Sequence, residues 1–163
     1  MNKIFSYVFL VILSIFGILL QTTLLSPIHF GIYSPDLNLI LIVIIALLCG
    51  LKEGTILTIG NGYIMDVLSG NLLGVNTLSR LSVFAIVHSI TDNVYINRTP
   101  LLALAFFFST VFSWGFMWVV IKINPSAFFG FSLLDILKQG FVNTMLGIPL
   151  FFIIKKYYER VQK

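Results

Sequence analysis

The chain has 163 residues, of which 58% are hydrophobic and 10% charged, with a formal net charge of +4 and a mean hydropathy of +1.03. Soluble domains carry about 25% charged residues, and a chain of this length could not bury so much apolar surface in water. The composition therefore excludes an ordinary soluble domain and predicts a single integral membrane domain over residues 1–163.

Six stretches are candidates for transmembrane helices, each of which needs about 20 apolar residues to cross the hydrocarbon layer. In chain order they are residues 4–25, 36–51, 54–68, 72–90, 101–123 and 133–154. The third is short and polar, so a re-entrant or strongly tilted segment is an alternative there. Gly147 to Pro149 is expected to kink the sixth stretch. We therefore expect an all-α, polytopic bundle of six transmembrane helices.

The distribution of positive charge predicts the orientation of these helices. The first stretch resembles a signal peptide, but it is long and lacks an A-x-A cleavage site, so we interpret it as a retained anchor. With the N-terminus in the cytoplasm, only Lys122 falls near an outer loop. Seven basic residues then fall on the cytoplasmic side, as the positive-inside rule requires: Lys3, Lys52, Arg98, Lys155, Lys156, Arg160 and Lys163. The basic tail is expected to contact anionic lipid headgroups, or else a cytoplasmic partner. Nothing in this charge pattern indicates nucleic acid.

Small and polar residues recur every four positions along the third stretch, which places them on one helix face. They are Gly54, Thr58, Gly62, Asp66 and Gly70. Small residues at this spacing let two helices approach closely in a membrane. We therefore expect the third helix to lie in the middle of the bundle, where protein rather than lipid surrounds its polar side chains.

Asp66 is costly inside a membrane unless it has a partner. The fourth stretch brings Asn76 to about the same depth and Arg80 one turn deeper, so we expect Asp66 to contact both. These residues are interpreted as a buried polar clamp that fixes the register of the two helices. Transfer of protons or binding of a substrate is the alternative interpretation of the same pattern.

A second polar group marks the start of the sixth stretch. Asp135 and Lys138 are neighbours at spacing i,i+3 and are expected to form an ion pair at the membrane surface, while Asn143 is expected to bond another helix. The two histidines, His29 and His88, are far apart, and Cys49 is the single cysteine, so no metal, cofactor or catalytic site is expected.

The middle of the sequence resembles the MreD family of bacterial rod shape-determining membrane proteins. Pro35-Asp36-Leu37 opens an apolar helix, a glycine-rich helix ends in Gly62-x-x-x-Asp66, and Ser69-Gly70-x-x-Leu73-Gly74 follows. Thr58 stands where that family usually has a further glycine. Gly74 joins the residues expected to pack helices, and Asp36, Asp135, Lys138 and Asn143 are candidates for an interface.

The resemblance implies a non-enzymatic role in the bacterial plasma membrane. Proteins of this kind work with the bitopic protein MreC in the elongation machinery (the elongasome), which includes actin-like MreB, the glycosyltransferase RodA and a class B penicillin-binding protein. Sidewall peptidoglycan synthesis, and hence cell shape, depends on that assembly. The resemblance also implies an architecture like the vitamin-binding S-components of energy-coupling-factor transporters.

Three other functions fit parts of the pattern. A vitamin-binding S-component would need a ligand pocket near the outer face, and the first stretch lacks the A-x-x-x-A face by which those subunits dock. An intramembrane aspartyl peptidase would need a second catalytic aspartate, which the sequence does not provide. A channel would need a ring of charges or a polar stripe along a pore, and neither is present.

Overall fold

The computed structural model describes residues 2–25, 34–69, 73–93, 99–123 and 132–162, and the regular structure in this part of the chain is entirely helical. The elements are α1 (Asn2–Leu19), the π-helical turn η1 (Leu20–Leu25), α2 (Leu37–Leu48), α3 (Leu51–Ser69), α4 (Val75–Asn93), α5 (Thr99–Ile123) and α6 (Leu133–Gln162). An all-helical fold is thus confirmed for the described residues. α6 passes through Pro149 and ends eight residues later than expected.

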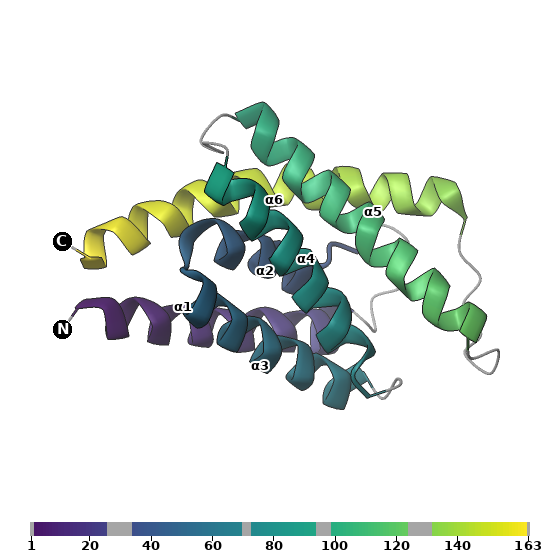
Figure 1. Ribbon diagram of the computed structural model, residues 1–163, viewed down its shortest axis with the longest axis horizontal. Coiled ribbons are helices and arrows are strands. Elements are labelled where there is room, and N and C mark those ends of the chain that lie inside the picture. The colour runs from purple at the N-terminus through teal and green to yellow at the C-terminus, as the bar shows by residue number, and fades with distance from the viewer. Residues whose placement is uncertain (1, 26–33, 70–72, 94–98, 124–131, 163) are drawn as a thin grey trace.

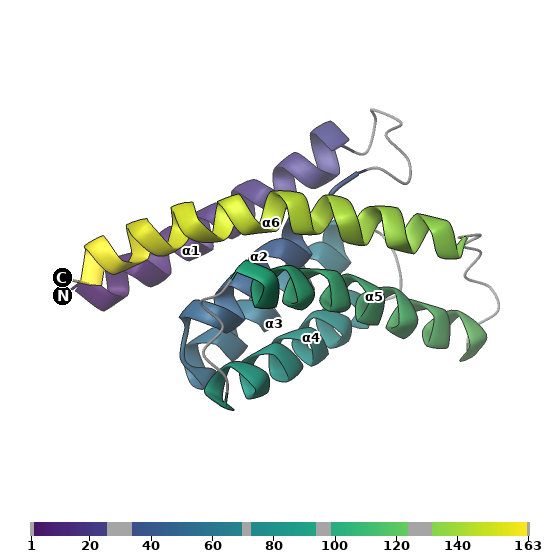
Figure 2. The same ribbon diagram turned by 90° about the horizontal axis from the view of Figure 1, so that it is seen from above.

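Consecutive helices run in alternating directions, so the two termini lie side by side at one end of the molecule (Figures 1 and 2). α1 and α6 are neighbours there, and the ring centroids of Phe9 and Tyr157 are 4.2 Å apart. α3 and α5 begin toward this end, whereas α5 finishes at the opposite end (Figure 1). The basic residues Lys52 and Lys155 therefore lie toward the end that holds both termini, and Lys122 lies toward the other.

α2 forms the centre of the bundle. It contacts each of the five other α-helices, and every residue from Asn38 to Ala46 is buried. The helix begins where the side chain of Asp36 accepts a hydrogen bond from the backbone N–H of Leu39, an N-cap that satisfies one of the free donors of the first turn. Its twelve residues rise only about 18 Å, less than the roughly 30 Å hydrocarbon thickness.

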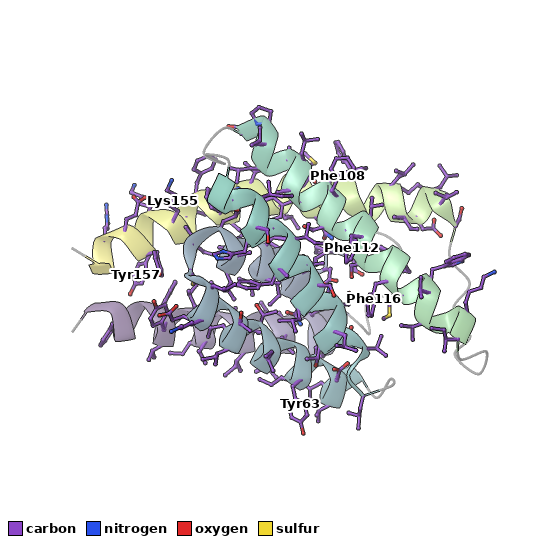
Figure 3. All side chains as sticks on the ribbon, in the orientation of Figure 1. Tyr63, Phe108, Phe112, Phe116, Lys155 and Tyr157 are labelled. Carbon is purple, nitrogen blue, oxygen red and sulfur yellow. The ribbon has the colours of Figure 1, made fainter. Side chains whose placement is uncertain are left out.

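The expected central position of the third helix is wrong. α3 packs mainly against α4 along one face, and its opposite face is exposed at Ile56, Tyr63 and Val67. Figure 3 shows Tyr63 on the side of α3 that points away from the bundle. The low hydropathy of α3 has a simpler cause, because Gly54, Thr58, Gly62 and Asp66 are buried on one face of the helix, and Gly54, Gly62 and Asp66 contact α4 there.

By length and composition alone, two helices of the described part are long and apolar enough to cross a membrane, with spans at Thr99–Val120 and Leu133–Arg160. The apolar segments Tyr7–Thr23 and Leu37–Leu48 are shorter. The number of complete membrane crossings therefore stays a prediction, although the helices occur close to the expected positions.

Candidate functional site

A buried ion pair joins α2 to α4. Nη2 of Arg80 lies 2.5 Å from Oδ2 of Asp36, and the two side chains are only 5% and 15% exposed. Asp36 is placed there because it caps α2, and Arg80 because α4 packs along α2. Charges within a membrane bundle are costly and are normally paired and functional, so this pair is the natural centre of the candidate site.

Three further elements bond to the ion pair. Nη1 of Arg80 donates to the hydroxyl of Ser113 on α5 at 3.0 Å, and the side-chain oxygen of Asn143 on α6 accepts from the backbone N–H of Asp36 at 2.8 Å. Gln21 of η1 donates to Oδ1 of Asp36 at 3.4 Å and accepts from the backbone N–H of Asn38 at 3.1 Å. The network therefore ties η1, α2, α4, α5 and α6 together at one level.

Hydrogen bonds between α5 and α6 extend this network. The amide nitrogen of Asn143 donates to the hydroxyl of Thr110 at 3.0 Å, and both residues are buried. Gln139 donates to the backbone carbonyl of Ser34 at 3.2 Å and accepts from the indole N–H of Trp114. Asn143 thus bonds another helix as expected, whereas Gln21, Thr110 and Ser113 were not foreseen. Their only signal in the sequence is a polar side chain within an apolar stretch.

Asp66 holds the start of α4. Its two carboxylate oxygens accept hydrogen bonds from the backbone N–H groups of Gly74, Asn76 and Thr77 and from the Thr77 hydroxyl, at 2.6 to 3.1 Å. Asp66 is 1% exposed. A carboxylate at this position satisfies the free N–H groups of the helix and complements the positive end of its dipole.

The expected contact between Asp66 and Arg80 is wrong, because Arg80 pairs with Asp36 on a different helix. Asp66 and Asn76 do lie together. The four donors at the start of α4 already occupy the carboxylate of Asp66, and Arg80 lies more than one turn farther along α4. The two aspartates therefore belong to two separate sites, one at a helix start and one in the network.

The small residues of α3 bring this helix close to α4. A Cβ added to Gly62 would lie 2.5 Å from the Cα of Thr77, and one added to Gly54 would lie 2.5 Å from the Phe84 ring. Thr58, between them, is fully buried. Gly74 has φ of +93°, a left-handed conformation that glycine adopts without strain. Gly70 lies outside the described residues.

The ion pair expected between Asp135 and Lys138 is not among the contacts of Asp135 in the described residues. Instead, Asp135 accepts a hydrogen bond from the backbone N–H of Ser132 at 3.0 Å, and the hydroxyl of Ser132 accepts from the N–H of Leu134 at 3.4 Å. This reciprocal arrangement is a capping box, which closes the first turn of α6. A local backbone donor therefore takes the carboxylate that was expected to pair with Lys138.

An apolar groove of about 510 Å³ lies between α4 and α5. Its lining includes Val87 from α4 and Ala105 and Phe108 from α5, and among the described residues that line it only Ser109 has a polar side chain. Figure 3 shows Phe108 and Phe112 along α5. Pockets for polar small molecules carry several converging polar groups, so this groove does not match a vitamin pocket. No cluster of metal-binding side chains occurs among the described residues.

A helical bundle with an apolar exterior, whose buried charged side chains are hydrogen-bonded inside it, has the arrangement of an integral membrane protein. The family model described as rod shape-determining protein MreD matches residues 1–161. The chain therefore belongs to the MreD family, as its sequence pattern predicted. No curated protein and no solved structure matches it. The likeness to energy-coupling-factor S-components stays a prediction.

Proposed function

We propose that this chain is a non-enzymatic membrane scaffold of the machinery that elongates bacterial cells. The observation that carries the proposal is the family match over residues 1–161, which gives the chain a role in determining rod shape. The chemistry of the site agrees with a scaffold. Its charged and polar groups bond one another across helices, and none is arranged as a nucleophile with a base.

The proposed partners are an MreC-like bitopic protein and, through it, MreB, RodA and a class B penicillin-binding protein. Contact through helix surfaces is the route that the chain length favours. The longest connection between helices, residues 26–36, has eleven residues, too few for a binding domain. The exposed helix faces are instead large and apolar, as on α3 and α5, and transmembrane helices of partners associate through such faces.

The proposed location is the plasma membrane, as one multi-pass domain with both termini in the cytoplasm. The seven-to-one distribution of Lys and Arg supports this orientation. The arrangement of the helices supports it as well, because Lys52 and Lys155 lie toward the end of the molecule that holds the termini.

In this proposal the polar network is the clamp that gives the scaffold a fixed shape. Without a hydrophobic driving force between helices in lipid, packing and interhelical hydrogen bonds must hold them in register. The Asp36–Arg80 pair and its partners bond across five elements at once. A partner protein would then bind a helix surface whose shape is fixed by the network.

Depletion in the native bacterium tests the proposal. We expect rounded cells after loss of the protein, and rescue of shape by the wild-type chain expressed from a second locus. A tagged chain extracted in mild detergent should co-purify with the MreC-like protein, and an unrelated tagged polytopic protein should not. Unchanged cell shape after complete depletion would contradict the proposed function.

A further inference from the structure

Four buried side chains have polar atoms without a hydrogen-bond partner in the described part of the chain. One is the hydroxyl of Ser14 on α1. The other three side chains come from α2, α3 and α4, and their atoms are both amide atoms of Asn38, the hydroxyl of Thr58 and Nε of Arg80. Asn38 and Thr58 are fully buried, and Arg80 is 4% exposed. Native interiors pair nearly all of their buried polar groups, and lipid around the bundle offers none. A lone hydroxyl can remain unpaired at a modest cost, but several such atoms at one place can share a partner inside the bundle.

Two of the three side chains lie at the same level between α3 and α4. The register of this antiparallel pair is fixed by two contacts, Gly54 with Phe84 and Gly62 with Thr77. Thr58 lies midway between the two glycines and, at a spacing of four, on the same helix face. On α4, the position midway between Thr77 and Phe84 is at residues 80–81. The buried hydroxyl of Thr58 therefore faces α4 at the level of Arg80.

Asn38 joins this level from α2. The side chain of Arg80 extends from α4 to Asp36, two residues before Asn38. α2 packs against both α3 and α4, and Asn38 is buried in its first turn. The three side chains thus come from three helices that contact one another, at the depth of the ion pair.

We propose that Asn38, Thr58 and Arg80 form an internal water-binding site between α2, α3 and α4. A buried water typically makes about three hydrogen bonds. Here Nε of Arg80 is a donor, while the hydroxyl of Thr58 and the amide of Asn38 can both donate and accept. The site takes water or a neutral polar molecule of similar size. An anion is disfavoured because Asp36 already neutralises Arg80.

Water at this position would lie beside the Asp36–Arg80 pair. Desolvation is the main cost of a buried ion pair, and water that penetrates to it lowers this cost. The site therefore explains how a guanidinium whose Nε has no protein partner can be held inside a membrane bundle. It follows from packing and hydrogen bonding alone and does not depend on the role in cell shape.

The substitution Thr58→Val tests the site through the sign of the change in melting temperature. Valine keeps the branched shape of threonine and removes the hydroxyl. If the hydroxyl binds water, its loss strands that water, and the melting temperature of the purified protein should fall by about 2 to 4 °C. If the hydroxyl has no partner, valine removes an uncompensated polar group, so an unchanged or raised melting temperature overturns the proposal.

Ser14 provides the matched control. Its buried hydroxyl also lacks a partner, but it belongs to α1, one turn before Gly17, which packs on Leu41 in the apolar part of α2. Ser14→Ala should therefore leave the melting temperature unchanged or raise it slightly. A fall as large as that of Thr58→Val would mean that the loss of any buried hydroxyl has this effect, which would also overturn the proposal.

A direct measurement on the wild-type protein tests the site even if the substituted proteins do not fold. In protein labelled uniformly with ¹³C and ¹⁵N, the side-chain amide of Asn38 should show magnetisation transfer from water in a nanodisc. The signal is assigned on the wild-type protein itself by triple-resonance correlation, so no variant has to fold. An assigned amide without transfer from water would rule out the site.

Discussion

Asp36 and Asp66 lie inside the bundle but are stabilised by different partners. Asp36 bonds a charged guanidinium and a backbone N–H, whereas Asp66 accepts hydrogen bonds from uncharged groups of Gly74, Asn76 and Thr77 at the start of α4. Removing the charge therefore has different consequences at the two positions. At Asp36 a positive charge loses its partner, and at Asp66 a helix loses part of its cap.

We predict that Asp66→Asn destabilises the protein although the two side chains have the same shape. Both carboxylate oxygens of Asp66 accept hydrogen bonds, and an amide replaces one of them with a donor that faces other donors. The free energy of unfolding should fall by about 1 to 2 kcal/mol. Thermal unfolding in detergent measures the change.

Asp135→Asn is the control for this substitution, because Asp135 also lies at a helix start but accepts one backbone hydrogen bond at a more exposed site. An amide oxygen can take over that single bond, so stability should stay within about 0.5 kcal/mol of wild type. Equal losses in the two variants would argue against the cap formed by Asp66.

We predict that Asp36→Asn is strongly destabilising and that a second substitution, Arg80→Met, largely reverses it. The single change leaves the Arg80 charge buried without a countercharge, at a cost of about 3 kcal/mol or more, whereas the double variant has no buried charge and should recover most of the loss. Unfolding of the two single variants and the double variant forms a double-mutant cycle.

The exposed pair Lys155–Glu159, at 3.8 Å, supplies the control for the loss of a charge. Glu159→Gln should change stability by less than about 1 kcal/mol, because solvent screens the exposed pair. The prediction is contradicted if the double variant at positions 36 and 80 is less stable than either single variant. In that case the buried ion pair would not be the main interaction of these two side chains.

The existence and approximate position of each helix along the chain could be predicted from the sequence. Long apolar stretches bounded by proline and charged residues can form few structures other than helices in a membrane. The position of each helix in the bundle could not be predicted in this way. The apolar side chains of α2 face protein and those of α3 face lipid, and hydropathy does not distinguish these two environments. This is why the third helix was wrongly expected at the centre.

We predict that Gly62→Ala separates α3 from α4. The added Cβ would lie 2.5 Å from the Cα of Thr77, which is backbone and cannot move aside as a side chain can. Overpacking of this kind costs about 1 to 3 kcal/mol, and the start of α4, which Asp66 holds from α3, would shift with it. The melting temperature and the yield of folded protein measure the effect.

Gly60→Ala is the matched control on the same helix, since nothing lies within 4 Å of a Cβ at that position. Alanine has the higher helix propensity, so this variant should be as stable as wild type or slightly more stable. A destabilised Gly60→Ala protein together with a normal Gly62→Ala protein would contradict the packing of α3 on α4.

For the whole molecule, the long-range contacts of the site were the part that sequence could not supply. Asp36 and Arg80 are 44 residues apart, and Asp36 and Asn143 are 107 apart. Spacing along the chain identifies partners within a helix or across a short turn, such as Asp66 and Asn76. The partner of Arg80 depends on which helix packs beside α4, and that arrangement is a property of the complete bundle.

The membrane orientation of the whole molecule can be measured with introduced cysteines, and the single native cysteine does not have to be removed first. Cys49 lies between α2 and α3 and is 4% exposed. A thiol that is buried among packed side chains is not accessible to a reagent in the surrounding water. Maleimides should therefore leave native Cys49 unlabelled and react with it after denaturation in detergent.

We predict that single cysteines introduced at the two ends of the bundle are labelled from opposite sides of the membrane. Lys122 and Arg160 are both exposed basic residues, but α5 and α6 end at opposite ends of the molecule. In spheroplasts a membrane-impermeant maleimide should label Lys122→Cys at once and Arg160→Cys only after permeabilisation, because the side with more Lys and Arg faces the cytoplasm. Immediate labelling of Arg160→Cys would place the C-terminus outside. Because α1 and α6 lie side by side, it would also place the N-terminus outside and invert the proposed topology as a whole.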